Sequence, residues 1–240
     1  MASVIFGSAR IDERGKAIGG KAGDQTGKEV STQAYYKHSK GWRVFRAKDP
    51  AKRKLIAEAM RRACNNNNIG YDQGQRLTLY EAVKDFGFDP AKATKAVETD
   101  CSALVRVCCA FAGITLPNFV TSNQASALLN SGAFEEMKGA KYTDQEDYLE
   151  EGDILVTRTK GHTVVVLTSG DKAEVAPTEP AGDLTIATGT WNVRSGPGTG
   201  WPVVKTVKGG DRLQSVDDND WIPVLIDGQV RWVSPKAVSR

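Results

Sequence analysis

The 240-residue chain has few cysteines, few histidines, no long apolar run and no marked excess of either charge. Four cysteines are too few for a disulfide scaffold, so the thiols are expected to be reduced. The 32 basic and 29 acidic residues nearly balance, which gives no indication of a nucleic-acid partner. No stretch approaches the roughly 20 apolar residues of a membrane span. The N-terminus lacks the basic and apolar regions of a signal peptide. These absences predict a protein made in the cytoplasm, without membrane insertion.

One break in composition divides the chain. Residues 171–183, DKAEVAPTEPAGD, contain two prolines and small or acidic residues without apolar periodicity, as in a linker. Helix and strand patterns precede this segment, and only strand and turn patterns follow it. We therefore expect a domain over 1–175, a linker over 176–183 and a second domain over 184–240.

The first part has the pattern of an α+β domain. Asp49 and Pro50 mark the start of a helix over 49–64. Further helices are predicted at 78–87, at 89–97 and at 122–132, the last capped by Ser122. Residues 152–170 predict two strands joined by a turn at Lys160–Gly161. Helices followed by a hairpin favour a helix packed on an antiparallel sheet.

The glycine-rich segment before residue 46 does not predict a nucleotide site. Gly23 and Gly27 are separated by three residues, whereas a phosphate loop requires four, and Glu29 follows Lys28. An acidic residue at that position would repel phosphate. The glycines are expected to form turns that line a groove, and no cofactor is expected.

Three of the four cysteines lie in the stretch ETDCSALVRVCCAFAG, at 98–113. Its apolar spacing predicts a helix that Thr99 or Asp100 caps. Cys101 then lies in the first turn, where free N–H groups and the helix dipole favour a reactive thiolate. Cys108 would lie about 10.5 Å further along the helix, too far for a disulfide or a shared metal. Cys108, Cys109 and Cys64 are therefore expected to be packing residues, and no metal site is expected.

A reactive thiol needs a base, and the chain offers two histidines. His38 lies in the polar stretch YYKHSK and is expected to be a solvated surface residue. His162 begins the apolar run HTVVVLT directly after a glycine. The spacing leaves two interpretations of His162: a base beside Cys101, or a strand-end residue whose imidazole bonds to a backbone carbonyl.

The motifs TDCSALV and GDILVTRTKGHTVVVL resemble those of NlpC-type cell-wall cysteine peptidases and of the related CHAP amidohydrolases. The resemblance covers about 65–176 and implies a papain-like α+β core. It implies Cys101 as nucleophile, His162 as general base and Tyr71, in IGYDQGQ, as a phenol near the thiolate and the oxyanion. Asp100 and Asp153 match motif positions that are usually structural, although Asp153 could equally be an ordinary turn residue.

The resemblance leaves the residue that orients the imidazole open. The family has a polar residue about a dozen positions after the base, which here is Glu174. A carboxylate at this position could hold the imidazolium, but Glu174 is equally well interpreted as a solvated residue of the linker. Residues before 65 lie outside the resemblance and are expected to be an N-terminal elaboration.

The C-terminal part resembles bacterial SH3-like (SH3b) domains through TWNVRSGPGTGWPVV and the closing WV. This resemblance implies a small all-β barrel that binds the cell wall. Some of the four tryptophans must be core, and one or two are candidates for a groove that binds wall peptide or glycan. The candidate wall-binding residues are Trp191, Arg194, Trp201 and Trp232.

Together these features predict a peptidoglycan hydrolase of the phage endolysin type, with bacterial peptidoglycan as its partner. The bond cut would be an amide, as in an endopeptidase or an N-acetylmuramoyl-L-alanine amidase. The absent signal peptide suggests release to the wall by a holin. Two alternatives stay open: a catalytically inactive wall-binding protein, and a cysteine transacylase.

Overall fold

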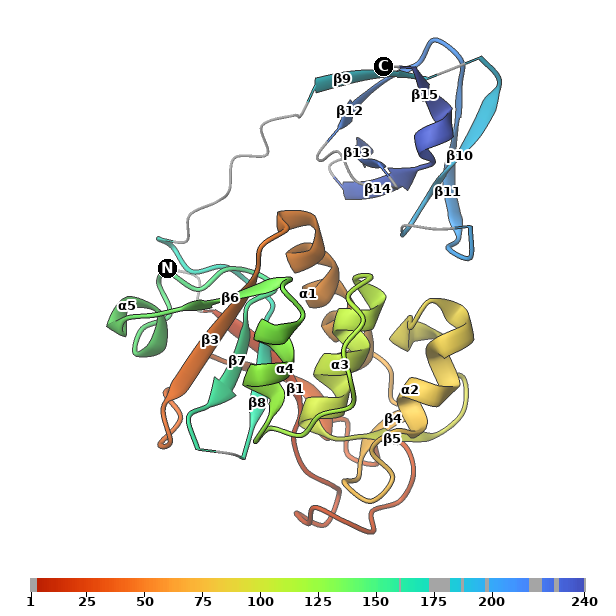
Figure 1. The fold of residues 1–240 in the computed structure, drawn as a ribbon. Helices are drawn as coiled ribbons and strands as arrows, with labels where there is room; N and C mark the ends of the chain where they lie inside the picture. The colour runs from red at the N-terminus through yellow and green to blue at the C-terminus, as the bar shows by residue number, and fades with distance from the viewer. Residues whose placement is uncertain are drawn as a thin grey trace. The chain divides into compact units, whose positions relative to one another are not determined.

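The chain forms two compact units, Met1–Glu174 and Val175–Arg240, and each is described here by itself (Figure 1). The computed structural model describes residues 4–159, 161–172, 182–186, 188–196, 199–215, 222–226 and 229–239. No helix in these ranges is long and apolar enough to cross a membrane.

The first unit is built on a six-stranded antiparallel sheet with the order β2-β1-β8-β7-β3-β6. Its strands are β1 (Ile5–Ala9), β2 (Val30–Ala34), β3 (Trp42–Ala47), β6 (Phe134–Met137), β7 (Ile154–Thr157) and β8 (Thr163–Val166). A separate pair of short parallel strands is formed by β4 (Ile69–Tyr71) and β5 (Val97–Thr99). The hairpin predicted over 152–170 is present as β7 and β8, and Lys160 lies outside the described residues.

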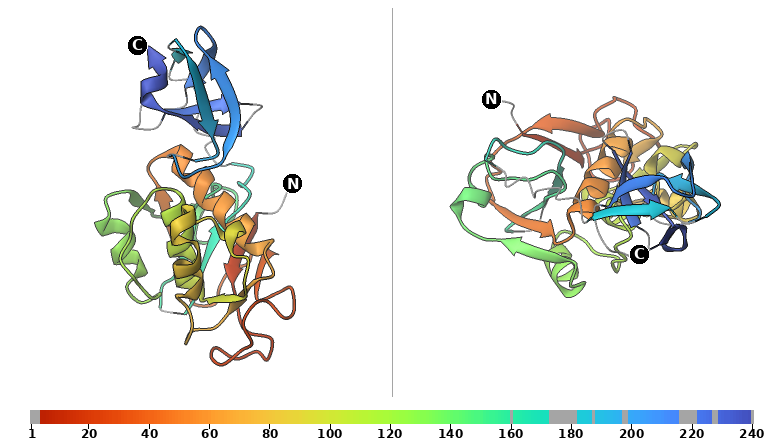
Figure 2. Two further views of the ribbon diagram at one scale, coloured as in Figure 1. Left: turned by 90° about the vertical axis from the view of Figure 1, so that its right-hand side faces the viewer. Right: turned by 90° about the horizontal axis from the view of Figure 1, so that it is seen from above.

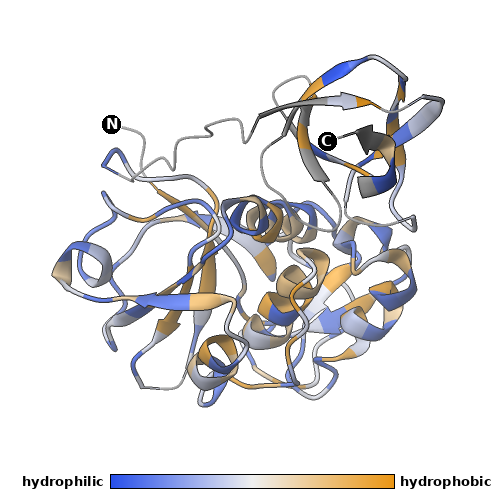
Figure 3. Cartoon of the chain, turned by 45° about the horizontal axis from the view of Figure 1, so that its top comes forward, coloured by the Kyte–Doolittle hydropathy of each residue, from blue (hydrophilic) through white to orange (hydrophobic). Residues whose placement is uncertain are grey.

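Two helices, α1 (Pro50–Cys64) and α3 (Cys101–Phe111), pack against each other and against the sheet (Figure 2). The shorter helices are α2 (Thr78–Val83), α4 (Gln124–Asn130) and α5 (Ala140–Thr143), with 3₁₀ turns at Lys84–Phe86 and Pro90–Lys92. Apolar residues predominate where α3 meets the sheet (Figure 3). This mixed architecture, with antiparallel strands, is compatible with the predicted α+β class.

The start of α1 follows the prediction. The side chain of Asp49 accepts hydrogen bonds from the backbone N–H groups of Ala51 and Lys52, and Pro50 occupies the first turn. Both features satisfy or remove N–H groups that would otherwise lack partners. Its buried face comprises Ala51, Leu55, Ile56, Ala57, Ala59, Met60 and Ala63.

Two local predictions are wrong. The Asp-Pro pair at 89–90 begins only a 3₁₀ turn, Pro90–Lys92, and Val97 already belongs to β5. The parallel pairing of β5 with β4 thus outweighs the helical spacing. In α4, the residue before the helix is Asn123 rather than Ser122. The Asn123 side chain accepts from the backbone N–H of Val120 instead of capping the helix.

The N-terminal segment is an integral part of the first unit, contrary to its interpretation as an elaboration. Strand β1 lies between β2 and β8, with Gly7 opposite Val165. A Cβ atom at Gly7 would lie 2.5 Å from Cγ of Met60, so helix α1 packs directly on this strand. Without residues 5–34 the sheet would lose two of its six strands.

A buried ionic cluster fastens β3 to the turn before β7. The Asp153 side chain is fully buried and accepts two hydrogen bonds of 2.8 Å from the Arg46 guanidinium. It also accepts from the backbone N–H of Glu150 at 2.8 Å. The Glu150 carboxylate in turn pairs with Arg46 and Arg53. These contacts give Asp153 a structural role, as its motif position implied.

The second unit is an antiparallel sheet with the order β11-β10-β14-β13-β12-β9-β15. Its strands are β9 (Gly182–Ile186), β10 (Thr190–Arg194), β11 (Val203–Lys208), β12 (Arg212–Ser215), β13 (Ile222–Ile226), β14 (Gln229–Val233) and β15 (Val238–Ser239), with a 3₁₀ turn at Pro235–Ala237. The predicted linker 176–183 therefore ends too late, since Gly182 and Asp183 belong to β9, and residues 176–181 lie outside the described ranges.

The tryptophans of the second unit divide between core and surface. Trp201 and Trp232 are buried, and Gly196 lies directly against the Trp201 ring. Trp191 is half-buried and packs on a core that includes Val193 and Val233. Trp201 and Trp232 are thus among the tryptophans that build the core. Wall binding stays a prediction, and Trp191 is the more accessible candidate.

Candidate functional site

Cys101 is the first residue of α3, directly after strand β5. The Asp100 side chain caps this helix by accepting a hydrogen bond of 2.6 Å from the backbone N–H of Ala103. Asp100 also accepts from the Ser102 hydroxyl at 2.8 Å and from Arg76 Nε at 2.6 Å. Of the two predicted caps, Asp100 is the one used, and its contacts fix the turn that carries the thiol.

The Cys101 thiol is buried, with 6% of the residue exposed. Burial raises its pKa to about 12, with a further increase from the Asp100 charge, although the backbone N–H groups of Thr163 and Ser102 lower it. The expectation that the helix start gives a lowered thiol pKa is therefore wrong, because desolvation outweighs the amide groups. The thiol is neutral at rest. All four cysteines are free, and Cys108 and Cys109 are buried as expected of packing residues.

His162 immediately precedes β8, in the turn that joins β7 to β8. Its backbone N–H donates to the Thr157 hydroxyl at 3.1 Å, and its carbonyl accepts from the Thr157 backbone N–H at 3.0 Å. The next residue, Thr163, directs its backbone N–H at the Cys101 sulfur. The start of β8 and the start of α3 therefore meet at the thiol.

The His162 imidazole is neutral at pH 7. Burial lowers its pKa to about 4, and the charges of His38 and Arg10 lower it further. Among the described residues, no hydrogen bond to the imidazole is found, so the alternative of a backbone carbonyl partner has no support in the structure. The predicted orienting residue, Glu174, lies outside the described residues.

A cavity of about 480 Å³ opens beside His162. It is lined by Arg10, Ile11, Gln33, Tyr36 and His162. Burial raises the pKa of Tyr36, a hydrogen bond with Gln33 and the Arg10 charge oppose the shift, and the Cys101 charge adds to it. The Cys101 charge therefore acts on one of the side chains that line this cavity.

The segment between β2 and β3 brings further side chains to this site. Trp42 Nε1 donates to the Tyr36 carbonyl at 3.0 Å. The Tyr36 ring packs edge-to-face against the ring of Phe6 in β1. His38 is half-buried, with its ring centroid 5.2 Å from that of Trp42. Its Nδ1 accepts from the Lys40 backbone N–H at 3.1 Å, and burial lowers its pKa. His38 is therefore not the solvated surface residue that the polar stretch suggested.

Tyr71 lies in β4 and pairs with Thr99 of β5, two residues before Cys101. The residue is buried, and its hydroxyl accepts a hydrogen bond of 2.9 Å from Gln73 Nε2. Burial raises the pKa of Tyr71 to about 12, and the Cys101 charge contributes to the increase. The phenol therefore stays protonated at neutral pH and can donate a hydrogen bond.

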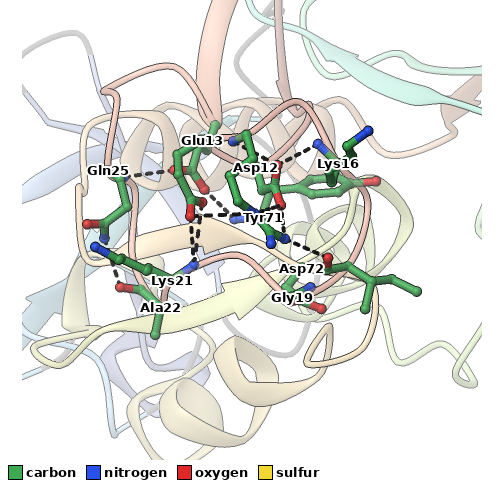
Figure 4. Close-up of polar contacts among 12 residues, drawn as sticks. Asp12, Glu13, Lys16, Gly19, Lys21, Ala22, Gln25, Tyr71 and Asp72 are labelled. Atoms are coloured by element: carbon green, nitrogen blue, oxygen red, sulfur yellow. Dashed lines mark hydrogen bonds and ion pairs between the residues drawn. The ribbon is translucent and has the colours of Figure 1, made fainter.

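The loop over residues 10–29 borders Tyr71 and is held by carboxylates (Figure 4). Asp12 accepts from the backbone N–H groups of Arg14 and Lys16. Asp72 accepts from the backbone N–H of Gly19 at 2.6 Å, which ties the loop to the residue after Tyr71. Glycines form turns here, as expected, with Gly19 at a φ of 87°.

Glu98 is a further buried carboxylate under this loop, with 3% of the residue exposed. Its Oε1 accepts from the Gly23 backbone N–H at 2.8 Å, while its buried Oε2 has no hydrogen-bond partner among the described residues. Burial raises the pKa of Glu98 to about 7, and the nearby charge of Glu29 adds to this. An ionised Glu98 therefore costs stability at neutral pH.

Replacing Glu98 with glutamine is expected to stabilise the protein by about 2 kcal/mol at pH 8. The folded pKa lies above the unfolded value, so wild type loses stability as pH rises from about 4.5 to 7. The Glu98→Gln variant should lack that loss. Urea unfolding at pH 5 and pH 8 measures the free energy of unfolding of both proteins. Glu81→Gln, at an exposed carboxylate, is the control. Equal pH dependence in wild type and Glu98→Gln would contradict the buried charge.

The sequence motifs predicted a site of Cys101, His162 and Tyr71 but did not indicate Arg10, Gln33 and Tyr36. These three lie before the resemblance begins, and the pairing of β1 with β2 and β8 places them beside His162. The short apolar run VIF at 4–6 was the available strand signal. Among the described residues, no three His, Cys, Asp or Glu side chains are grouped to hold a metal ion.

Comparison with known proteins gives one match. The model of the family described as "Endolysin-like domain" matches residues 6–173, which is most of the first unit and includes β1 and β2. No curated protein matches the chain, and no solved structure matches it.

Proposed function

The chain belongs to the endolysin-like domain family, and on that premise we propose that it is a peptidoglycan hydrolase with a cysteine nucleophile. Membership of this family indicates a role in cell-wall lysis. The proposal adds that Cys101 attacks an amide bond of the wall peptide and that the first unit is a papain-like catalytic domain. The observation that carries it is the Thr163 backbone N–H at the Cys101 sulfur, because Thr163 directly follows His162 in the chain.

The acylation step starts from a neutral thiol and a neutral imidazole. The S–H proton of Cys101 moves to His162 as the sulfur attacks the carbonyl carbon of the amide. The C–N bond then breaks, and the His162 proton passes to the leaving amine, which leaves a thioester on Cys101. In the second half, His162 takes a proton from water, the hydroxide adds to the thioester, and the thiol leaves with that proton.

The developing oxyanion requires hydrogen-bond donors. Tyr71 and Tyr36 both lie within electrostatic reach of Cys101, and both have raised pKa values because they are buried. Each phenol is therefore an O–H donor throughout the neutral range. We assign oxyanion stabilisation to Tyr71, as the resemblance implied, and consider Tyr36 a second donor.

The pH dependence of kcat/KM should show a broad plateau. His162 must be unprotonated to act as a base, and its pKa is lowered to about 4. Activity is therefore expected to rise with pH through about 4 and to change little between about pH 6 and 9. Initial rates of wall clearing across this range measure the profile. A midpoint near 6.5, the ordinary histidine value, would contradict the buried neutral imidazole.

Digestion of purified bacterial walls tests the proposal. Wild type should lower turbidity and release fragments with a new amino terminus and a new carboxyl terminus, which mass spectrometry identifies. The position of the cut distinguishes an amidase from an endopeptidase. Products with a new amide in place of a free amine would instead identify a transacylase. Intact walls without new termini would refute hydrolysis.

The burial of Cys101 favours a second candidate function, that of an inactive wall-binding protein. A thiol that is 6% exposed and has a raised pKa reacts slowly with small electrophiles. The second unit would then carry the function, as an SH3-like module that binds wall through Trp191 and Arg194. Sedimentation with walls, combined with no release of wall fragments, would favour this alternative.

We further propose that the protein reaches the wall after synthesis in the cytoplasm, through a holin that opens the membrane. Membership of the endolysin-like family, which indicates a role in cell-wall lysis, motivates this route. Secretion of the protein by intact cells would contradict it.

A further inference from the structure

Among the residues that the structure describes, the lining of the cavity beside His162 carries one full positive charge and no carboxylate. Its walls are formed by Arg10, Ile11, Gln33, Tyr36 and His162. The imidazole is neutral at pH 7 because burial lowers its pKa to about 4. The Arg10 guanidinium is therefore the charged group of the lining.

The Arg10 charge is not neutralised by the acidic residues around it. Asp12 forms an ion pair of 2.7 Å with Arg14. The Glu29 carboxylate accepts from the backbone N–H groups of Gln25 and Tyr71. No carboxylate of the described residues lies within ion-pair distance of Arg10. The N–H groups of the Arg10 guanidinium are thus available to donate hydrogen bonds to a ligand.

The backbone fixes where Arg10 lies. Its N–H donates to the Glu29 carbonyl at 2.7 Å, directly after the last residue of β1. The side chain is exposed, and its charge reaches His162 and Tyr36. A ligand held by Arg10 would therefore lie next to the catalytic imidazole.

We propose that this cavity is a substrate subsite that binds a free carboxylate of the wall peptide through Arg10, close to the amide that Cys101 attacks. This inference rests on the proposed function, since it names the part of the substrate that the same site selects. A guanidinium and a carboxylate form charge-assisted hydrogen bonds in a fixed geometry. Gln33 and Tyr36 supply neutral polar partners, and Ile11, 40% exposed, supplies an apolar wall for an aliphatic side chain.

The size and charge of the cavity favour a peptide carboxylate over a phosphate polymer. About 480 Å³ accommodates a few peptide residues, and a single guanidinium matches a single carboxylate. A polyanion would be expected to follow a row of cations, but Arg10 is the one charged residue among the described residues of the lining. The subsite therefore selects an acidic peptide.

Binding without turnover tests this subsite. In the Cys101→Ala background, calorimetry compares a short wall peptide with a free carboxylate beside the scissile amide against the same peptide amidated at that carboxylate. We expect about 10-fold tighter binding of the carboxylate form. Adding Arg10→Gln should make the two affinities equal. Adding Lys28→Gln, which removes an exposed charge from the same N-terminal segment, should leave the preference unchanged.

Equal affinities in the Cys101→Ala background would overturn the proposal, and so would a preference that survives Arg10→Gln. If inorganic phosphate binds as tightly as the peptide, and this binding depends on Arg10, the cavity is a general anion site and not a site for a peptide carboxylate. Failure of the proposed function is separate: wild type would then bind the carboxylate peptide selectively without cleaving it.

Discussion

Replacing Cys101 with alanine is expected to lower the rate of wall clearing by about 10⁴-fold or more, because the acyl-enzyme then has no atom on which to form. The Asp100 cap and the Arg76 contacts do not involve the sulfur, so helix α3 should start at the same residue. Turbidity loss of purified walls, compared at equal protein concentration, measures the effect.

The matched control is the same substitution at Cys64, a free thiol at the end of α1. Burial raises the pKa of Cys64 to about 12, as it does for Cys101, so the two thiols have similar intrinsic acidity. Cys64→Ala should retain wall clearing within about twofold, because only Cys101 meets the start of β8. Equal clearing by wild type and Cys101→Ala would refute the nucleophile.

Replacing Asp153 with asparagine is expected to destabilise the first unit by about 3 kcal/mol, since removal of one partner leaves a buried charge uncompensated. Asparagine keeps the size of the side chain but turns one oxygen into an N–H donor. That donor would face either Arg46 or the Glu150 backbone N–H, both of which are donors themselves. The midpoint of the first unit's thermal transition should fall by about 6–12 °C.

Asp147→Asn is the matched control, because Asp147 pairs with Lys172 at an exposed site. Its transition should coincide with that of wild type. Calorimetry of the full chain also supplies an internal reference, since the transition of the second unit should not move in either variant. A shift below 2 °C in Asp153→Asn would contradict a structural role for the buried cluster.

Local signals made some of the site predictable. The Asp-Cys-Ser cap places Cys101 at a helix start, and the glycine before His162 marks the start of a strand. Both signals are short-range, because caps and hairpins depend on neighbouring residues. The meeting of the two elements was available only through the resemblance, since no spacing rule states which strand end faces which helix.

The remainder depends on long-range packing, which the sequence does not display. Arg10 and Tyr36 reach the site because β1 pairs with β8 and because residues 35–41 cross from β2 to β3. The thiol pKa was predicted in the wrong direction for a related reason. The helix start is a local property, whereas the burial of Cys101 depends on the whole unit.

The position of β1 between β2 and β8 also determines when the site can form. Gly7 pairs with Val165, so a segment near the start of the first unit waits for one of the last segments of that unit. Contacts between residues so far apart in sequence slow folding, because a long loop must close before they form. On the ribosome, the cavity lacks its wall at His162 until nearly all of residues 6–173 have been translated. A growing chain therefore has no assembled cavity until this unit is nearly complete.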